Sequence, residues 1–226
     1  AAELNRCRLD SLHLSKKYQE PDLSFALDAN FRGNSIDNIE GRICLDRFKF
    51  TTATDTCHLE SLELNALGHS EERRLTIESA LVNGRIEGAY SFRTLVPSLI
   101  QTMQQYVPAL IRFAPKQPIE ENNFQLLLTV ENTEAFSRAF RLPFTMVSTG
   151  RITGQYDNRL DKFRFEAWLP KFQVGKSLFE SGYLSCGNPA DQVNLEVRAI
   201  NYNLLGRRNY LNLKAEAKED VLQTFV

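Results

Sequence analysis

The sequence predicts a mostly β, antiparallel protein, and three observations support that fold class. Apolar and polar residues alternate with a period of two through most of the chain, as they do in strands with one apolar face. Clusters of Gly, Asn, Asp and Pro interrupt the alternation at short intervals. Most connections are shorter than a parallel crossover requires, so we expect a meander of about ten to twelve strands.

The chain up to Tyr90 is predicted to form consecutive strands. Strict alternation over 23–31 predicts the first of them. The pattern over 39–50 shifts by one residue before Phe48 and Phe50. Such a shift predicts a bulge or a turn, because one extra residue moves every later side chain to the other face. Further strands are expected at 62–66, 75–81 and 84–90.

The period changes between Thr94 and Phe113, where apolar residues recur at spacings of three and four. This spacing predicts an amphipathic helix. Pro97 suits its first turn, whereas Pro108 is expected to kink the helix or to split it in two. The stretch holds few basic residues, which favours packing against the sheet over lying on a membrane surface. The side expected to face inward, and to cap the sheet, carries Leu95, Leu99, Met103, Val107 and Leu110.

A Pro-rich and acidic connector around 115–123 is the best candidate for a boundary. It divides the chain into 1–114, which ends in the amphipathic helix, and 119–226, which continues the same sheet. A short helix is expected at 134–140, capped by Asn132 or Thr133. Strands are expected at 124–130, 144–156, 163–169, 178–186, 193–199 and 211–217.

Two local features leave alternatives open. Trp168 is out of phase with its apolar neighbours, so it either marks an exposed contact surface or packs under a helix or loop. The tripeptide Gly-Arg-Ile begins at Gly41, Gly84 and Gly150, with each glycine on the apolar side of its strand. A glycine there leaves space, allows a close backbone approach, or simply marks a bend.

Composition and motifs exclude several classes of function. A formal net charge of −1 argues against broad nucleic-acid binding. No stretch approaches the roughly 20 apolar residues that a membrane-spanning helix needs. The chain shows neither an initiator Met nor a secretory signal, so we expect it to be part of something longer.

Signatures of catalysis are also missing from the sequence. It contains no Gly-x-Ser-x-Gly motif and no phosphate-binding loop. The histidines are isolated, and His58 with Glu60 has no evident third ligand. The four scattered cysteines are compatible either with a disulfide or with free buried thiols. We therefore expect no enzyme, no catalytic residue, no metal site and no cofactor. An enzyme acting on envelope polysaccharide would need carboxylates clustered in a cleft.

Three stretches resemble the TamB and AsmA-like family of cell-envelope proteins, in the form found in the Bacteroidetes. They are the strand phrase 75–91, the helix 94–110 and the segment 135–144. Together they cover under half of the chain, and similar strand patterns surround them. The resemblance implies β-strands curled into an open, taco-like hydrophobic groove, within a periplasmic protein anchored in the inner membrane.

The resemblance also implies a function in lipid transport. Such proteins carry phospholipid between the inner and outer membranes and support outer-membrane biogenesis, as in the translocation and assembly module. This chain would be an internal segment, reaching an outer-membrane assembly protein of the Omp85 type through parts outside it. The residues expected to line the groove are Phe25, Leu27, Ile43, Leu45, Leu64, Ile77, Ile86, Phe124, Leu126, Ile152, Phe163, Phe165, Leu195, Val197 and Leu213.

The periodicity alone fits a second architecture. A structural or adhesive β-sandwich, acting as an envelope scaffold without lipid transport, needs the same alternation of apolar and polar residues. An open groove and a closed sandwich differ in whether a second sheet covers the apolar face, which alternation does not encode.

Overall fold

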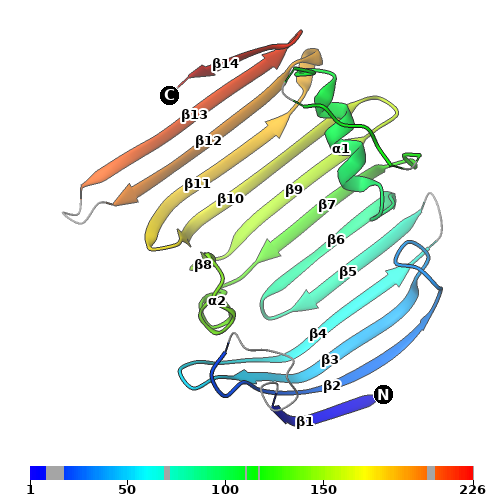
Figure 1. Cartoon of the computed structure of the whole chain (residues 1–226), viewed down its shortest axis with the longest axis vertical. Helices are drawn as coiled ribbons and strands as arrows, with labels where there is room; N and C mark the ends of the chain where they lie inside the picture. The colour runs from blue at the N-terminus through cyan, green and yellow to red at the C-terminus, as the bar shows by residue number, and fades with distance from the viewer. Residues whose placement is uncertain (9–17, 69–71, 110, 117, 203–206, 226) are drawn as a thin grey trace.

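The computed structural model describes residues 1–8, 18–68, 72–109, 111–116, 118–202 and 207–225. All described strands belong to one antiparallel sheet of fourteen strands (Figure 1). The strands pair in sequence order from β1 to β7 and from β9 to β14, while the short β8 pairs with part of β10. The expected mostly β, antiparallel meander is confirmed.

The first half of the sheet consists of β1 (Ala2–Arg8), β2 (Asp22–Arg32), β3 (Glu40–Thr51), β4 (Thr56–Leu67), β5 (Arg73–Ser79) and β6 (Val82–Ala89). Helix α1 (Leu95–Gln104) follows. The second half consists of β7 (Asn123–Val130), α2 (Glu134–Phe140), β8 (Phe144–Met146), β9 (Gly150–Asp157), β10 (Lys162–Val174), β11 (Ser177–Gly187), the 3-10 turn η1 (Pro189–Asp191), β12 (Val193–Tyr202), β13 (Arg208–Lys218) and β14 (Val221–Phe225). Strands β6 and β7 pair directly, so the sheet is continuous across the connector.

The sheet is open, and its two ends carry the two ends of the chain (Figure 1). The accessible surface is 14408 Å². A compact protein of the same mass exposes about 10,500 Å². The excess is what a single extended layer produces, because a second layer would remove one face of the sheet from solvent. The sheet has more strands than expected, because β1 and β14 were not predicted and the strand expected at 144–156 is two strands, β8 and β9.

The predicted phase shift before Phe48 is confirmed as a β-bulge. Arg47 has a φ of 53°, and the pairing of β2 with β3 shifts register between Ser24 and Ala26. Beyond the bulge, Phe48 and Phe50 lie opposite Leu59 and Cys57. The bulge therefore returns the phenylalanines to the apolar face of the sheet.

Helix α1 is shorter than the spacing of apolar residues predicts, because it ends at Gln104. The expected continuation to Phe113 is wrong. Pro108 has no N–H to donate, and its ring disfavours helical geometry in the preceding residue, Val107. Val107 thus lies beyond the helix and is buried, while Leu110 lies outside the described residues. The short helix expected at 134–140 is confirmed as α2.

Candidate functional site: the apolar face of the sheet

One row of paired residues crosses the sheet and is apolar at every position. Residues directly opposite each other on neighbouring strands share a face. At a strand spacing of about 4.8 Å, a row from β2 to β13 is about 48 Å long. The row consists of Ala29, Ile43, Leu64, Ile77, Gly84, Leu128, Ile152, Ala167, Leu184, Val197 and Leu213.

A second apolar row runs parallel to it, two residues along each strand and therefore on the same face. It consists of Phe31, Gly41, Ala66, Leu75, Ile86, Leu126, Gly154, Phe165, Cys186, Leu195 and Ala215. Together the rows form an apolar face that is continuous over most of the sheet.

This face is uncovered along its middle. No side chain of the first row is fully buried, and Leu184 is 37% exposed. When a second layer packs against a sheet, apolar residues on the facing side, like those of the first row, form the core between the layers. Within the described part of the chain, that second layer is absent and the first row contacts solvent, whereas Ile86 of the second row belongs to the cluster beneath α1 and Leu126 and Phe165 pack against it.

The predicted lining residues all lie on this face, according to the strand register. Most of them are half-buried. Three of them, Ile86, Phe124 and Phe163, are buried instead, because α1 packs over them. These three are therefore part of the core beneath the helix.

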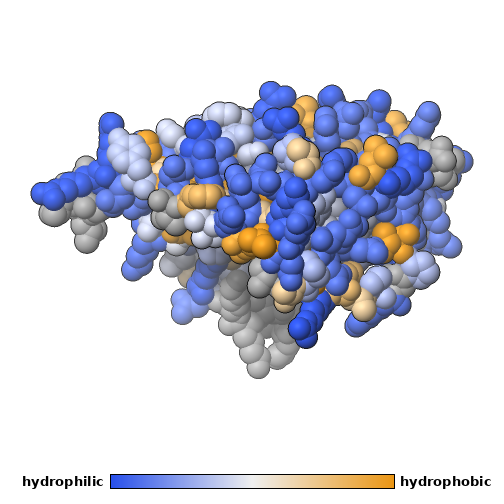
Figure 2. Space-filling view, turned by 90° about the horizontal axis from the view of Figure 1, so that it is seen from above, coloured by the Kyte–Doolittle hydropathy of each residue, from blue (hydrophilic) through white to orange (hydrophobic). Residues whose placement is uncertain are grey.

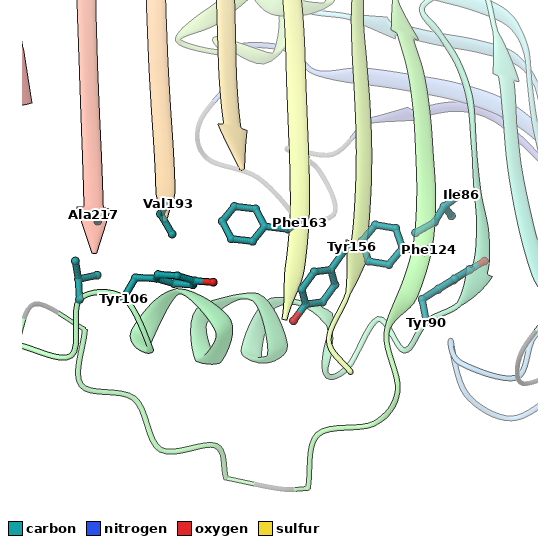
Figure 3. Close-up of a cluster of buried hydrophobic side chains, with 9 residues drawn as sticks. Ile86, Tyr90, Tyr106, Phe124, Tyr156, Phe163, Val193 and Ala217 are labelled. Carbon is teal, nitrogen blue, oxygen red and sulfur yellow. The ribbon is translucent and has the colours of Figure 1, made fainter. Parts of the chain in front are cut away.

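Helix α1 covers one rim of the apolar face, across the ends of the strands (Figure 3). Leu95, Leu99 and Met103 pack against the cluster beneath it. The aromatic and aliphatic side chains of this cluster come from strands far apart in the sheet and from the residue after β6, and they include Tyr90, Phe124, Tyr156, Phe163, Val193 and Ala217.

Buried polar contacts fix the position of α1, and the apolar spacing gave no sign of them. The hydroxyl of Tyr156 forms hydrogen bonds with Ser98 Oγ (2.7 Å) and Thr102 Oγ1 (3.0 Å). Burial raises the pKa of Tyr156, so its hydroxyl stays protonated. Ser98 and Thr102 are four residues apart, so both hydroxyls lie on the side of α1 that faces Tyr156.

Asparagines connect the same helix region to the sheet. Asn188 Oδ1 accepts a hydrogen bond from the backbone N–H of Phe163 (2.8 Å), and its Nδ2 donates to the hydroxyl of Tyr106 (2.7 Å). Asn122, which is fully buried, accepts from the backbone N–H of Ser91 at 3.1 Å. These buried hydrogen bonds fix the position of α1 and of the segments on either side of it against the sheet.

Helix α2 covers the opposite rim, at the lower ends of β3 and β4 (Figure 1). Phe140 stacks on Phe50 with ring centroids 4.8 Å apart. Cys57 is completely buried there, and desolvation raises the pKa of its thiol. The two helices thus cover the two rims and leave the first row open between them.

The opposite face of the sheet is charged, and its charges pair with one another. Arg74 Nε lies 2.6 Å from Glu87 Oε1, and Arg164 Nη2 lies 2.8 Å from Glu166 Oε1. Hydrogen bonds from Asn65 and then Arg42 lower the pKa of Glu63. Figure 2 shows the molecule from above, along the long axis of Figure 1, where its surface is mostly hydrophilic with separate apolar patches. The strand register places both apolar rows on one face of the sheet and these ion pairs on the other.

The cysteines are divided between the two faces, and all four are unpaired. Cys186 is partly exposed on the apolar face, between Phe165 and Leu195. Burial raises the pKa of this thiol. Cys44 is also partly exposed, but it lies opposite Asp28 and Glu63 on the charged face.

The glycines of the Gly-Arg-Ile tripeptides do not leave open space. Gly41 has a φ of +138°, and a Cβ there would overlap the backbone of β2. A Cβ on Gly84 would lie 2.5 Å from the backbone oxygen of Leu127, and one on Gly150 would lie 2.5 Å from Met146 Cε. The space left by the missing side chains is therefore occupied by the backbone of a neighbouring strand or by a nearby side chain.

Trp168 is exposed, as the first of the two interpretations expects. It lies on the charged face, is 55% exposed, and contacts the ring of Tyr183 with centroids 4.6 Å apart.

Neither helix in the described part of the chain is both long and apolar enough to cross a membrane. The described His, Cys, Asp and Glu residues form no group of three or more that could hold a metal ion. Comparison with protein-family models, with curated proteins and with solved structures found no match.

Proposed function

We propose that the apolar face binds the acyl chains of phospholipid. The chain then acts as one segment of a periplasm-spanning protein, anchored in the inner membrane, that carries phospholipid between inner and outer membranes. In this proposal the sheet supplies a stretch of taco-like groove. Other parts of the protein support outer-membrane assembly through a partner of the Omp85 type.

The observation that carries the proposal is the uncovered apolar row from β2 to β13. Its side chains are partly exposed along most of the row, and Ala29 and Leu184 are exposed. Soluble proteins rarely expose contiguous apolar patches larger than a few hundred Å², and larger ones mark binding surfaces. An elongated apolar strip about 48 Å long matches a long hydrocarbon ligand in shape.

The energies favour such a ligand. Each methylene removed from water contributes about 0.8 kcal/mol, so an acyl chain of about 16 carbons that buries half its surface gains about 6 kcal/mol. A carrier needs this gain at every position along its length, because any polar interruption would expose the chain to water. The first row contains no polar side chain.

The rims support the same proposal. Helices α1 and α2 pack at opposite ends of the strands, so they narrow the apolar face without crossing its middle. A ligand lying along the rows would run across the strands between the two helices. This direction leads from the β1 end of the sheet to the β14 end.

A scaffold without lipid is the second candidate. It predicts a sandwich, in which a second sheet fills the apolar face. All described strands belong to one sheet, and this observation favours lipid binding over the scaffold.

The test is mass spectrometry of organic extracts from the purified protein, with a β-sandwich protein prepared identically as the control. We expect stoichiometric phospholipid. Replacing Ile152 with Asp places a charge in the middle of the apolar row, and we expect at least tenfold less lipid, since an unpaired charge against hydrocarbon costs several kcal/mol.

The matched control is Thr129→Asp, on the neighbouring strand and the charged face, opposite Arg151. This variant should retain its lipid. Lipid-free extracts from folded wild-type protein, or equal losses in both variants, would leave the scaffold as the better account.

A further inference from the structure

The charged face carries a groove that the proposed lipid function does not use. Its volume is about 710 Å³, and its lining comes from β7, β9, β10, β11, β12 and β13. At about 4.8 Å between strands, it extends about 24 Å across the sheet. A groove of this length and modest volume suits an extended oligomer better than a compact molecule.

Aromatic rings lie at this groove. Tyr183 lines it, donates a hydrogen bond from its hydroxyl to Glu166 Oε1 (3.2 Å), and packs against Trp168. The guanidinium of Arg198 lies 4.7 Å from the centre of the Tyr183 ring on the same face. These contacts hold the ring of Tyr183 in place, while Trp168, which contacts Tyr183 but does not line the groove itself, remains 55% exposed. Flat, preordered aromatic rings beside polar groups suit a ligand that has both an apolar face and many hydroxyls.

The remaining lining supplies hydrogen bonds of both kinds. Gln125, Gln155 and Asn194 present amide donors and acceptors, and Ser185 presents a hydroxyl. Amide and hydroxyl side chains can both donate hydrogen bonds to ligand hydroxyls and accept them, whereas Lys and Arg only donate and ionised carboxylates only accept.

The charge of the groove argues against an anionic ligand. Its lining contains three cationic side chains and four carboxylates. Binding of nucleic acid or another polyanion depends on an excess of Lys and Arg, which is missing here. A neutral polymer fits this balance.

One carboxylate of the groove, Glu166, is held in its ionised form, which suits hydrogen bonding to a ligand. The hydrogen bond from Arg164, supported by that from Tyr183, lowers the pKa of Glu166. A glycosidase needs one carboxyl group that keeps its proton, which requires a raised pKa. Glu166 is held in the opposite state.

We propose that the groove on the charged face, beside Trp168 and Tyr183, binds a neutral linear oligosaccharide without cleaving it. The sugar rings stack on the aromatic side chains, and the hydroxyls bond to the amide and charged side chains between β7 and β13. This site is on the face opposite the apolar rows, so one protein could hold lipid on one side and glycan on the other.

Trp168 is the one tryptophan of the chain and contacts the lining residue Tyr183, so its fluorescence reports on the surroundings of that ring. We expect saturable changes in emission when cellohexaose or chitohexaose is added to the intact protein. The variants Tyr183→Ala and Gln155→Ala should each raise the Kd about five- to tenfold, the size of an aromatic or hydrogen-bonding contact. Gln155 is exposed, so its replacement leaves the fold intact.

The matched control is Tyr210→Ala, because Tyr210 is 72% exposed and lies outside the groove lining. It should bind as the wild type does. Calorimetry with Trp168→Ala should show the same loss as Tyr183→Ala. The proposal is overturned if neither sugar changes the emission, if all variants bind equally, or if new reducing ends show that the sugar is cut. Lipid content measured in the same samples separates this result from the lipid proposal, and we expect it to be unchanged in Tyr183→Ala.

Discussion

Replacing Arg73 with Met is expected to lower the free energy of unfolding by about 3–5 kcal/mol, the range for breaking a buried ion pair. Arg73 is 8% exposed at the start of β5. Its guanidinium lies 3.7 Å from Asp37, donates to the backbone oxygen of Tyr90, and covers the Tyr90 ring at 4.3 Å. Methionine keeps much of the volume but leaves these acceptors without their donor.

Asp37 explains why the loss is large. Its carboxylate also accepts hydrogen bonds from Ser91 Oγ (3.2 Å) and the backbone N–H of Phe92 (2.6 Å). Arg73 therefore connects the loop after β2 to the segment that leads into α1. Without Arg73, the largely buried carboxylate of Asp37 loses its ion-pair partner.

The neighbouring residue provides the control for this prediction. Arg74 is exposed and pairs with Glu87 at 2.6 Å, so Arg74→Met should cost at most about 1 kcal/mol. Urea unfolding followed by circular dichroism measures both variants. Equal midpoints for Arg73→Met and Arg74→Met would contradict the role given to the buried pair.

The second large effect is expected from Gly88→Val in β6. Gly88 has a φ of +124°, which a β-branched side chain rarely adopts. A Cβ would also overlap the backbone oxygen of Asn123 in β7. Strain and displaced pairing together should cost about 3–4 kcal/mol. The pairing of β6 with β7 should be disrupted around Gly88 and Phe124, next to the cluster beneath α1.

Gly175 distinguishes strain from overlap. It also has a positive φ, 58°, but a Cβ there would meet nothing within 4 Å. Gly175→Val should therefore show the conformational cost alone and be clearly milder. Hydrogen exchange of the β6 and β7 amides gives the local readout. If both variants have the same free energy of unfolding, steric overlap at Gly88 does not contribute to the loss of stability.

The sequence predicted which residues share a face because a strand has a period of two whatever the sheet does next. Ile43, Leu64 and Ile77 fall in one row for this reason. The bulge before Phe48 was visible as well, since it changes the phase of the pattern. The short helix α2 was predicted from its own residues; its N-cap is Thr133, whose side chain makes no capping hydrogen bond, while Asn132 accepts one from the backbone N–H of Glu134.

Other features depend on contacts that are distant along the chain. Ser98 and Tyr156 are 58 residues apart, and nothing local to either indicates that they bond. From the sequence alone, Arg73 looks like a solvent-exposed charge, because its partner Asp37 lies in a loop elsewhere in the chain. The early end of α1 was indicated by Pro108, but the apolar spacing around it suggested a longer helix.

Openness is the feature that alternation leaves undetermined. Leu184 and Val197 would show the same pattern in a filled sandwich and in an uncovered sheet. Their exposure depends on whether another layer exists, and this is a property of the whole fold. The groove beside Tyr183 was missed for a related reason, because its lining comes from six strands that are polar in the ordinary way.

The most direct test of the central claim uses two cysteines already in the chain. Cys186 lies on the apolar face and Cys44 on the charged face, and both are partly exposed. The protein is stripped of lipid, and maleimide modification of each thiol is followed by peptide mass spectrometry, with and without added phosphatidylcholine. Lipid bound on the apolar face should slow modification of Cys186 several-fold and leave Cys44 unchanged. Equal rates at Cys186 with and without lipid, in folded protein, would contradict the account.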